Sequence, residues 1–582
     1  MSIRVTELFD HHRTPAVILL VALAFAVSGA VWRAASPATW ATTPHTGLAA
    51  TESGLDASFA AAMIAHHQGA IDMARAELRG GRNEQLRRLA QEIIVTQQQE
   101  IAVMRLAITA GARVPVRGQA PGPSAAASVA VSHRDRVYAA EQFSNTVSVT
   151  DPVDNKLLGV IRLGDPQPTN LSPLYRGQVL VHGLGFSPDH TMLAVVAIGT
   201  NSVSFIETLT NVVKHTTYVG RAPHEAFFTP DGSEVWVTVR GEDYVAVLDA
   251  HTFVEKTRIK VPIGPGMQIF SPDGRYGYVC SSFTPTTVVI SVRDHRIIGR
   301  ITQDSPFCPN IAATPDGNQV WLTLKDIGRV MVFDARPPFS VLKRIDTGPL
   351  TNHVNFANTD NGIFAYVTVG GLNEVQVYRT SDFAKVATIA TGLLPHGVWP
   401  SGDGSRVYVG LENADALTAI NTQTNHVIAT VAVGQAPQAI AYVPNAVPNG
   451  DGMRGLQPLG IGGQSAQLHL FPVAANDSIR GARAPTSVTL FDQGLTQVLQ
   501  ASVTGLAPRQ AFVLALSADP SGSGPLEPLA DFNTNAAGAA IVNAVGPIRQ
   551  IVRDSAAAGR RFLVIASETS GKIGVLAQIQ AP

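Results

Sequence analysis

A repeat of about 42 residues runs through the middle of the chain and constrains its fold more than any other feature. Each copy leads into a turn such as SPDG or TPDG, and a β-branched and aromatic stretch such as VWVTV follows. Seven equivalent positions are 42 to 44 residues apart: 182, 224, 266, 309, 353, 396 and 438. A period of this length is typical of radially repeated folds, in which equivalent positions form a ring.

The segments between these positions predict the strands of a β-propeller. Each repeat has room for four short strands, which is the pattern of one propeller blade. Six blades are expected to start at positions 182 to 396, and one more is expected in the segment that begins at Asp135. We expect the strand at Gln438 to join that first blade and close a ring of seven blades.

The repeat sequences also resemble a known family. The segment VYVGLENADALTAINTQTNHVIATVAVGQAP, from Val407, closely resembles the YVTN-repeat family of seven-bladed propellers. The resemblance covers residues 128–445, which is more than half of the chain. It implies the propeller fold but says little about function, because related propellers include lactonases, haem and copper enzymes, and surface or scaffold proteins.

Histidine occupies four of the seven equivalent positions: His182, His224, His353 and His396. The inner strand of a blade begins at this position, so the four imidazoles are expected around one mouth of the central channel. The second strands end at the same face with Arg240, Lys325 and Glu412, and Glu225 follows His224. Ionisable groups from several blades therefore meet where a propeller site is expected.

Three functions are open for this mouth. Several imidazoles around a channel suit copper, zinc or iron. A lactone or ester hydrolase would use a histidine or Glu412 as base and Arg240 or Lys325 to stabilise an oxyanion, but the sequence has no GxSxG nucleophile motif. The third alternative is a noncatalytic binding platform. Covalent c-type haem is excluded because no CxxCH motif occurs.

Residues 50–114 predict a helical hairpin with a candidate copper site. Apolar residues recur at three- and four-residue steps, and Gly80 and Gly81 separate the two helical stretches. Thioether and imidazole side chains favour copper, particularly Cu(I); the alternative is that they fill a core and its polar edge. The candidate ligands are Met63, His66, His67, Met73 and Met104.

A second resemblance concerns this hairpin. The motifs MIAHHQGAIDMA and LAQEIIVTQQQEIAVM, in this order, resemble the exported helical family named domain of unknown function 305. Its members form ferritin-like helical bundles, and some bind copper through methionine and histidine. The resemblance implies that the same five residues bind copper, with Gln97 and Glu100 as polar neighbours. Because a bundle needs two hairpins, we expect self-association or a protein partner through these helices.

Residues 1–34 predict a signal peptide or an N-terminal membrane anchor. Arg4, His11, His12 and Arg13 precede an apolar run at residues 15–32. We therefore expect the rest of the chain to be exported, that is, periplasmic or extracellular. Export permits a disulfide between the two cysteines, Cys280 and Cys308. The formal net charge of −1 gives no reason to expect nucleic acid as a partner.

Two linkers, residues 115–127 and 446–466, flank the propeller. Alternating strands beyond the second linker predict a small antiparallel β-sandwich over residues 467–582. The expected fold is therefore multidomain and mainly β: an α-helical hairpin, a seven-bladed β-propeller and a β-sandwich. The expected function is a binding platform that handles copper at the hairpin and at the histidine-lined mouth. The alternative is a propeller enzyme at that mouth, either a metal-dependent redox enzyme or a lactonase-like hydrolase.

Overall fold

The computed structural model divides the chain into two compact units, residues 1–113 and 114–582. The residues that it describes are 52–83, single positions at 86, 90, 93, 97 and 101, and then 130–164, 179–460, 465–473, 485–493, 497–546, 548 and 560–580. The expected signal or anchor segment, the linker at 115–127 and Met104 lie outside them. Within the described residues, no helix has the length and apolar character that a membrane span needs.

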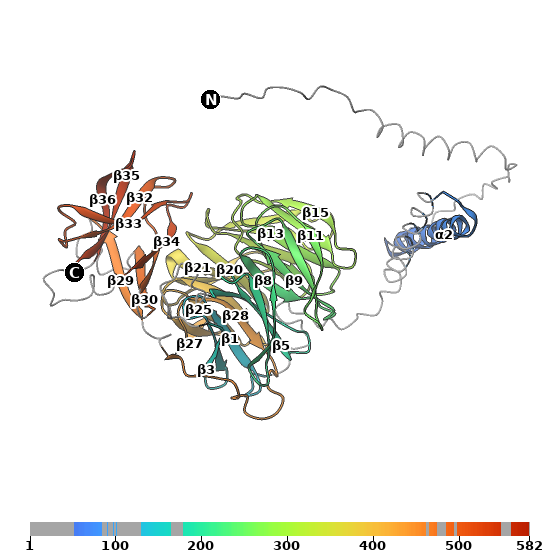
Figure 1. The fold of residues 1–582 in the computed structure, drawn as a ribbon, viewed down its shortest axis with the longest axis horizontal. Coiled ribbons are helices and arrows are strands. Elements are labelled where there is room, and N and C mark those ends of the chain that lie inside the picture. Colours follow the sequence, from blue (N-terminus) through green and yellow to red (C-terminus); the bar gives the residue numbers. More distant parts are fainter. Residues whose placement is uncertain are drawn as a thin grey trace, which may run out of the picture. The chain divides into compact units, whose positions relative to one another are not determined.

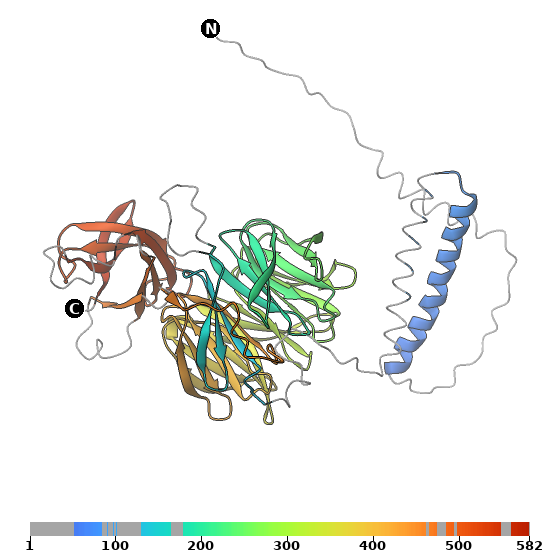
Figure 2. The same cartoon turned by 60° about the horizontal axis from the view of Figure 1, so that its bottom comes forward.

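The first unit contains the helix α2 (Glu52–Gly80), which Figure 2 shows as one continuous rod. Its buried residues follow one face at steps of seven, four and three: Ala60, His67, Ile71 and Ala74. The helix ends where the N–H of Gly81 donates to the carbonyl oxygen of Glu77 at 2.7 Å. The second helix of the expected hairpin falls mostly outside the described residues, so the hairpin stays a prediction.

The second unit contains seven four-stranded antiparallel sheets, which are the blades of a propeller. In blades 2 to 7 the four strands follow one another in sequence from the inner strand to the outer one. In blade 1 the inner strand β28 (Pro437–Val443) pairs with β1 (Arg136–Glu141), as Figure 1 shows. The predicted number of blades and the closure of the ring by the strand at Gln438 are therefore confirmed.

The remaining strands of the propeller follow blade by blade, from the inner strand outward. Blade 1 continues with β2 (Thr146–Asp151) and β3 (Lys156–Arg162). Blade 2 holds β4 (Val181–Phe186), β5 (Met192–Ala197), β6 (Ser202–Glu207) and β7 (Val212–Tyr218). Blade 3 holds β8 (Pro223–Phe228), β9 (Glu234–Val239), β10 (Tyr244–Asp249) and β11 (Glu255–Lys260). Blade 4 holds β12 (Pro265–Phe270), β13 (Tyr276–Ser281), β14 (Thr286–Ser291) and β15 (Arg296–Thr302).

Blade 5 holds β16 (Ile311–Ala313), β17 (Gln319–Leu324), β18 (Arg329–Asp334) and β19 (Val341–Asp346). Blade 6 holds β20 (Thr351–Thr359), β21 (Gly362–Val369), the short helix η1 (Gly370–Leu372), β22 (Glu374–Arg379) and β23 (Lys385–Ala390). Blade 7 holds β24 (Pro395–Pro400), β25 (Arg406–Leu411), β26 (Ala416–Asn421) and β27 (His426–Ala432).

An aromatic side chain near the middle of the second strand fills the core of six blades: Tyr138, Trp236, Tyr278, Trp321, Tyr366 and Tyr408. Each is less than 2% exposed, and burial of one such side chain stabilises the fold by roughly 2 kcal/mol. The glycine of the repeated turn has a φ of 70 to 73° at Gly232, Gly274 and Gly317. Glycine adopts this left-handed conformation without strain, which explains its recurrence in the repeat.

The C-terminal residues form one antiparallel sheet of eight strands in the order β33-β32-β35-β36-β29-β30-β31-β34. The bounds are β29 (Ser465–Pro472), β30 (Thr486–Asp492), β31 (Gln497–Val503), β32 (Ala511–Ser517), β33 (Leu526–Asn533), β34 (Ala540–Gly546), β35 (Phe562–Thr569) and β36 (Lys572–Gln580). The two edge strands, β33 and β34, contact each other, so the sheet curls into a barrel around its apolar core. The predicted strands are present, but the division into two sheets of a sandwich is not confirmed. We call this module the C-terminal barrel.

Candidate metal centre at the propeller mouth

A β-bulge places each of the four predicted histidines at the mouth of the channel. In blade 3, Pro223 pairs with Val239 and Ala226 with Val237, so His224 and Glu225 together face the single residue Thr238. The same irregularity falls at His182 in blade 2, at Asn352 and His353 in blade 6 and at His396 in blade 7. The prediction of four equivalent histidines is therefore wrong for His353, which occupies the bulge position of Glu225, while Asn352 occupies that of His224. A bulge turns a strand and redirects its side chains, and bulges are frequent next to functional sites.

The four histidines form an arc, which we call the histidine arc. The ring centroids of His182 and His224 are 4.3 Å apart, and those of His353 and His396 are 4.6 Å apart. His182 and His396 are separated by 6.3 Å, with the Gln438 position of blade 1 between them in the ring order. All four side chains are buried. The convergence of residues that lie up to 214 positions apart therefore occurs in the structure, as the repeat predicts.

Glu225 extends the arc and forms the tightest group with two histidines. One candidate ligand atom from each of His182, His224 and Glu225 lies within 4.8 Å of the other two. The approach of Glu225 requires a glycine after His182, because a Cβ on Gly183 would lie 2.5 Å from the Glu225 Oε2 and 2.3 Å from the His224 carbonyl oxygen. The glycine therefore makes room for the carboxyl group.

Several polar atoms of this group have no hydrogen-bond partner although they are buried: Nδ1 of His182, Nδ1 of His224, Oε1 of Glu225 and Nε2 of His353. Each such atom costs about 1–3 kcal/mol of desolvation unless something binds it. Four of them around one mouth are unusual, because buried polar groups in native proteins are nearly always paired. These atoms are therefore available to a bound ion, a ligand or an ordered water molecule.

Burial sets the protonation of the site. It lowers the pKa of His182 to about 3, and the charges of Arg240 and Lys325 act in the same direction. Burial also lowers the pKa values of His224, His353 and His396 well below the usual range, and it raises that of Glu225 well above its usual range. The imidazoles are therefore neutral at neutral pH, which is the form that binds metal ions.

Hydroxyl and amide side chains of the same blade and of the blade beside it fix the bulges. The Thr368 hydroxyl donates to the His396 carbonyl oxygen at 2.7 Å and accepts from the His353 N–H at 2.8 Å. Asn310 lies 3.4 Å from Nδ1 of His353 through its amide nitrogen and accepts from the Val354 N–H. Sequence reasoning missed these residues. Thr238, Thr323 and Thr368 share one position on the second strands, in VWVTV, VWLTL and YVTV, and that recurrence was the available signal.

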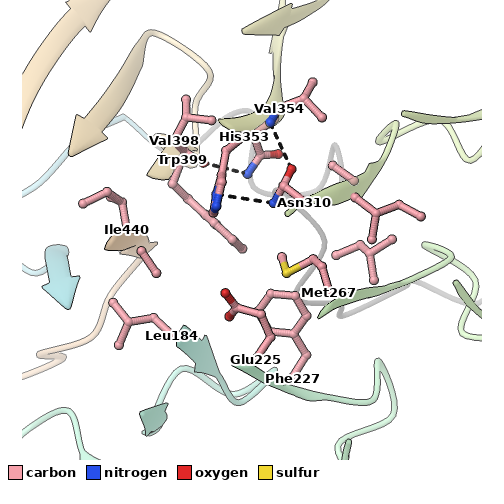
Figure 3. A pocket seen from close by; sticks show the side chains of 15 residues that line it. Leu184, Glu225, Phe227, Met267, Asn310, His353, Val354, Val398, Trp399 and Ile440 are labelled. Atoms are coloured by element: carbon pink, nitrogen blue, oxygen red, sulfur yellow. Dashed lines mark hydrogen bonds between the residues drawn. The ribbon is translucent and has the colours of Figure 1, made fainter. Parts of the chain in front are cut away.

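The channel below the arc is lined mostly by apolar side chains. Figure 3 shows Glu225 and His353 pointing toward this cavity from opposite sides, with Phe227 and Met267 beside Glu225. Leu184, Val398 and Ile440 complete much of its wall. An apolar wall excludes water and strengthens electrostatic interactions at the polar end, where the histidines lie.

The predicted cations and Glu412 also lie at this mouth. Arg240 and Lys325 follow the second strands of blades 3 and 5, and their charges depress the pKa of His182. Burial raises the pKa of Glu412, while the charge of Lys325 and the neighbouring amides of Gln438 and Gln500 oppose that shift. Gln500 belongs to β31 of the C-terminal barrel, so the barrel reaches the mouth itself.

The C-terminal barrel covers the mouth above blades 1, 6 and 7. The Thr489 hydroxyl donates to the Asn413 carbonyl oxygen at 2.7 Å, and the Gln493 amide donates to the Phe143 carbonyl oxygen at 2.9 Å. Phe143 packs on Phe491, and a second apolar cluster joins the barrel to the start of β20 and β24. The barrel is therefore a partial cover of the histidine face.

Cys280 and Cys308 form a disulfide at the same face, with their Cα atoms 6.1 Å apart. The bond links the end of β13 in blade 4 to the residues before β16 in blade 5. Position 266 of blade 4 is a glycine, and a Cβ there would lie 2.9 Å from the Cys308 carbonyl oxygen. This crowding explains why blade 4 has no histidine in the arc.

The helix α2 distributes its candidate ligands over different faces. His67 is buried and its Nδ1 donates to the Met63 carbonyl oxygen at 2.7 Å, whereas His66 is exposed. Met73 lies seven residues after His66 on the same face and is 71% exposed. Met63 is half-buried between the two histidines, and Met104 lies outside the described residues. The described part of the helix brings Met63, His66 and Met73 to one exposed side.

Comparison with known proteins finds a family model that matches part of the chain and solved structures of limited similarity. No curated protein matches the chain. Among solved structures, Kuenenia stuttgartiensis hydrazine synthase is similar at 20% identity and a TM-score of 0.40, over 44% of this chain and 88% of that chain. A functionally unknown protein from Desulfotomaculum acetoxidans DSM 771 is similar at 15% identity and a TM-score of 0.45, over 53% and 98%.

Residues 33–108 match the family model described as domain of unknown function (DUF305). The match includes Met63, His66, His67, Met73 and Met104, and the propeller lies outside it. The chain therefore joins a DUF305 segment to a seven-bladed β-propeller.

Proposed function

We propose that the histidine arc and Glu225 bind a transition metal ion, with copper as the first candidate, and that the propeller serves as the platform that presents it. The observation that carries the proposal is the set of four buried atoms without a hydrogen-bond partner on His182, His224, Glu225 and His353. A metal ion satisfies several such atoms at once. A hydrogen-bonding ligand would need matched donors and acceptors for each.

The donor set fits an ion that prefers imidazole. Neutral imidazole nitrogens suit copper, zinc and iron, whereas magnesium and calcium prefer several oxygen ligands. Glu225 would lose its proton when an ion binds, because a coordinating carboxylate must be deprotonated. The second reason to favour copper is the DUF305 segment, whose Met63, His66 and Met73 supply a thioether and imidazole set on one side of α2.

The residues of the mouth have distinct roles in this proposal. His182, His224 and Glu225 are the ligands that lie closest together, and His396 and His353 continue the arc. His396 Nδ1 donates to the Gln438 carbonyl oxygen at 2.8 Å, which fixes its ring and leaves Nε2 free to bind an ion. Thr368 and Asn310 hold the backbone of the bulges in place.

The test is the metal content of the purified chain after copper loading and removal of loosely bound ions. The double variant His182→Ala/His224→Ala is expected to lose the propeller copper, because it removes two ligands of the closest group. His426→Ala is the matched control, since His426 lies exposed on the outer strand of blade 7. Equal copper in all three proteins contradicts the proposal. Lactone hydrolysis that needs Glu412 and no metal would favour the hydrolase alternative.

We propose copper binding by the DUF305 segment as a separate function of the same chain. The supporting observation is the exposed Met73 on the face of His66, where a long apolar side chain gains nothing from burial. Replacement of Met63 by Leu and of His66 by Ala is expected to weaken Cu(I) binding in a competition assay with a chelator. The propeller copper should be unaffected by these changes. Unchanged total copper would contradict this function of the helix.

We also propose that the chain is exported, in agreement with the apolar run at residues 15–32 and with the disulfide between Cys280 and Cys308. Fractionation of the source cells is expected to place the protein in the periplasm, the medium or the outer face of the membrane. Recovery with the cytoplasmic proteins, with both thiols reactive toward a maleimide, would contradict it.

A further inference from the structure

Two cations, Arg240 and Lys325, lie at the mouth and form no ion pair with any residue that the structure describes. Among the described carboxylates, Glu412 attracts Lys325 from beyond ion-pair distance, and none acts on Arg240. The Arg240 Nε is buried without a hydrogen-bond partner. A partly buried cation without a partner is costly, because desolvation of its charge is not offset.

The carboxyl groups of the mouth neutralise these cations only in part. Glu412 attracts Lys325, whereas no carboxylate among the described residues acts on Arg240. Two cations with one neighbouring carboxylate leave an excess positive charge, which is centred on Arg240. A positive, partly enclosed mouth attracts anions.

Aromatic side chains surround one of the two cations. The guanidinium of Arg240 lies over the rings of Phe283 at 5.5 Å and of Phe307 at 5.3 Å. Ring contacts on its faces leave the edge of the guanidinium, with its N–H donors, free to bind a carboxylate through two hydrogen bonds. The stacking also fixes the orientation of the side chain before a ligand arrives.

The same side of the mouth presents apolar surface to solvent. Phe283 is 53% exposed and Ile263, which precedes β12, is 54% exposed. Both lie at the histidine face of blade 4, where the disulfide joins blades 4 and 5. Large apolar side chains beside an unpaired arginine indicate a ligand with an apolar body and an anionic group.

We propose that the mouth binds an organic carboxylate between blades 3 and 5, with its carboxylate on Arg240 and Lys325 and its apolar body against Phe283 and Ile263. The proposal deepens the proposed function, since it names the ligand class of the same mouth. The two remain separable, because the cations hold the carboxylate whether or not the arc contains a metal ion.

The experiment is a calorimetric titration of the full chain with benzoate, acetate and inorganic phosphate, on metal-free and copper-loaded protein. Arg240→Gln and Lys325→Gln are each expected to weaken benzoate binding about tenfold, the usual effect of losing a charge-assisted hydrogen bond. Arg240→Lys keeps the charge and should retain part of the affinity. Phe283→Ala should weaken benzoate binding and leave acetate binding unchanged, because acetate lacks the aromatic ring that would contact Phe283.

The matched control is Arg258→Gln, since Arg258 also stacks on an aromatic ring, Tyr244, but is paired with Glu255. Benzoate affinity that is the same in Arg240→Gln, Lys325→Gln and Arg258→Gln overturns the proposal. So does tighter binding of phosphate than of benzoate with no effect of Phe283→Ala, which assigns the cations to an inorganic anion. Copper content is measured on the same samples. Normal copper without benzoate binding refutes only the carboxylate site, and benzoate binding without copper refutes only the metal site.

Discussion

The helix α2 and the propeller mouth both carry histidines that the sequence marks as metal ligands, yet they place them differently. On α2 the neighbours His66 and His67 point to different faces, and His67 already donates to its own helix backbone. At the mouth, histidines from four blades converge, and three of them have a buried nitrogen atom without a hydrogen-bond partner. Adjacency in sequence separates side chains on a helix, whereas a repeat period of 42 to 44 residues brings distant side chains together.

The largest expected effect on stability is that of replacing a glycine by alanine at the propeller mouth, compared with the same change on α2. Gly183→Ala places a Cβ 2.5 Å from the Glu225 carboxyl oxygen, so we expect a loss of about 3 kcal/mol in the free energy of unfolding. Gly69 lies on α2 with nothing within 4 Å of an added Cβ, so Gly69→Ala should stabilise that helix by about 0.5–1 kcal/mol. Urea denaturation measures the free energy of unfolding of the propeller, and the helical content of the protein measures the stability of α2. A neutral Gly183→Ala would contradict the proposed packing of Glu225.

A second comparison is between the histidine arc and His295, which pairs with Glu234 at 2.8 Å. Burial raises the pKa of Glu234, but hydrogen bonds from His295, Trp236 and Lys256 outweigh it and lower that pKa to about 2. The folded pKa lies below the unfolded value, so the stabilisation is complete above about pH 4.5 and is lost as pH falls toward 2. Glu234→Gln should therefore cost on the order of 2 kcal/mol at neutral pH and progressively less in acid.

The control for this prediction is Glu255→Gln, which removes an exposed ion pair with Arg258 and should cost less than about 0.5 kcal/mol. Chemical denaturation over a series of pH values measures both variants. A cost of Glu234→Gln that stays constant down to pH 2 would show that its ionised form does not stabilise the fold.

The third prediction tests the support of the bulges. Thr368→Val removes the hydroxyl that joins the His353 N–H to the His396 carbonyl oxygen, so we expect a loss of about 1–2 kcal/mol in stability. Copper affinity should fall about tenfold, because second-sphere groups orient the ligands. Thr257→Val, at an exposed position on β11, is the control and should leave both quantities unchanged. Normal copper affinity in Thr368→Val would exclude a role of this hydroxyl in the site.

The smallest effect distinguishes the two neighbouring histidines of α2. His67→Ala removes a side chain from the buried face and should cost about 1 kcal/mol of helix stability. His66→Ala changes an exposed side chain and should alter stability by less than about 0.5 kcal/mol. Thermal unfolding followed by helicity measures both. Equal losses would contradict the assignment of the two side chains to different faces.

The repeat made the propeller predictable because its period, its turns and its strands agree. The seven blades, the closing strand at Gln438 and the four histidines at one face were all accessible from spacing alone. The bulges were not, because a register irregularity depends on the pairing of two strands and leaves no fixed sequence mark. The C-terminal barrel shows the same limit, since alternating strands do not reveal whether β33 and β34 close the sheet.

The site residues also divide into those that the repeat predicts and those that it does not. Arg240 and Lys325 were found because they end strands whose positions the repeat fixes. Asn310 was missed because it follows the repeat position Pro309, at the place that Glu225 and His353 take in their own blades. Gln500 was missed because it reaches the site from the C-terminal barrel. Such contacts exist only after the chain has folded.

The most direct test of the central claim is a crystal structure of the copper-loaded chain with anomalous diffraction data collected at the copper edge. We predict a peak at the propeller mouth, about 2 Å from imidazole nitrogens of His182 and His224. A peak at Met63 and His66 alone, with the mouth empty at full copper loading, would contradict the claim.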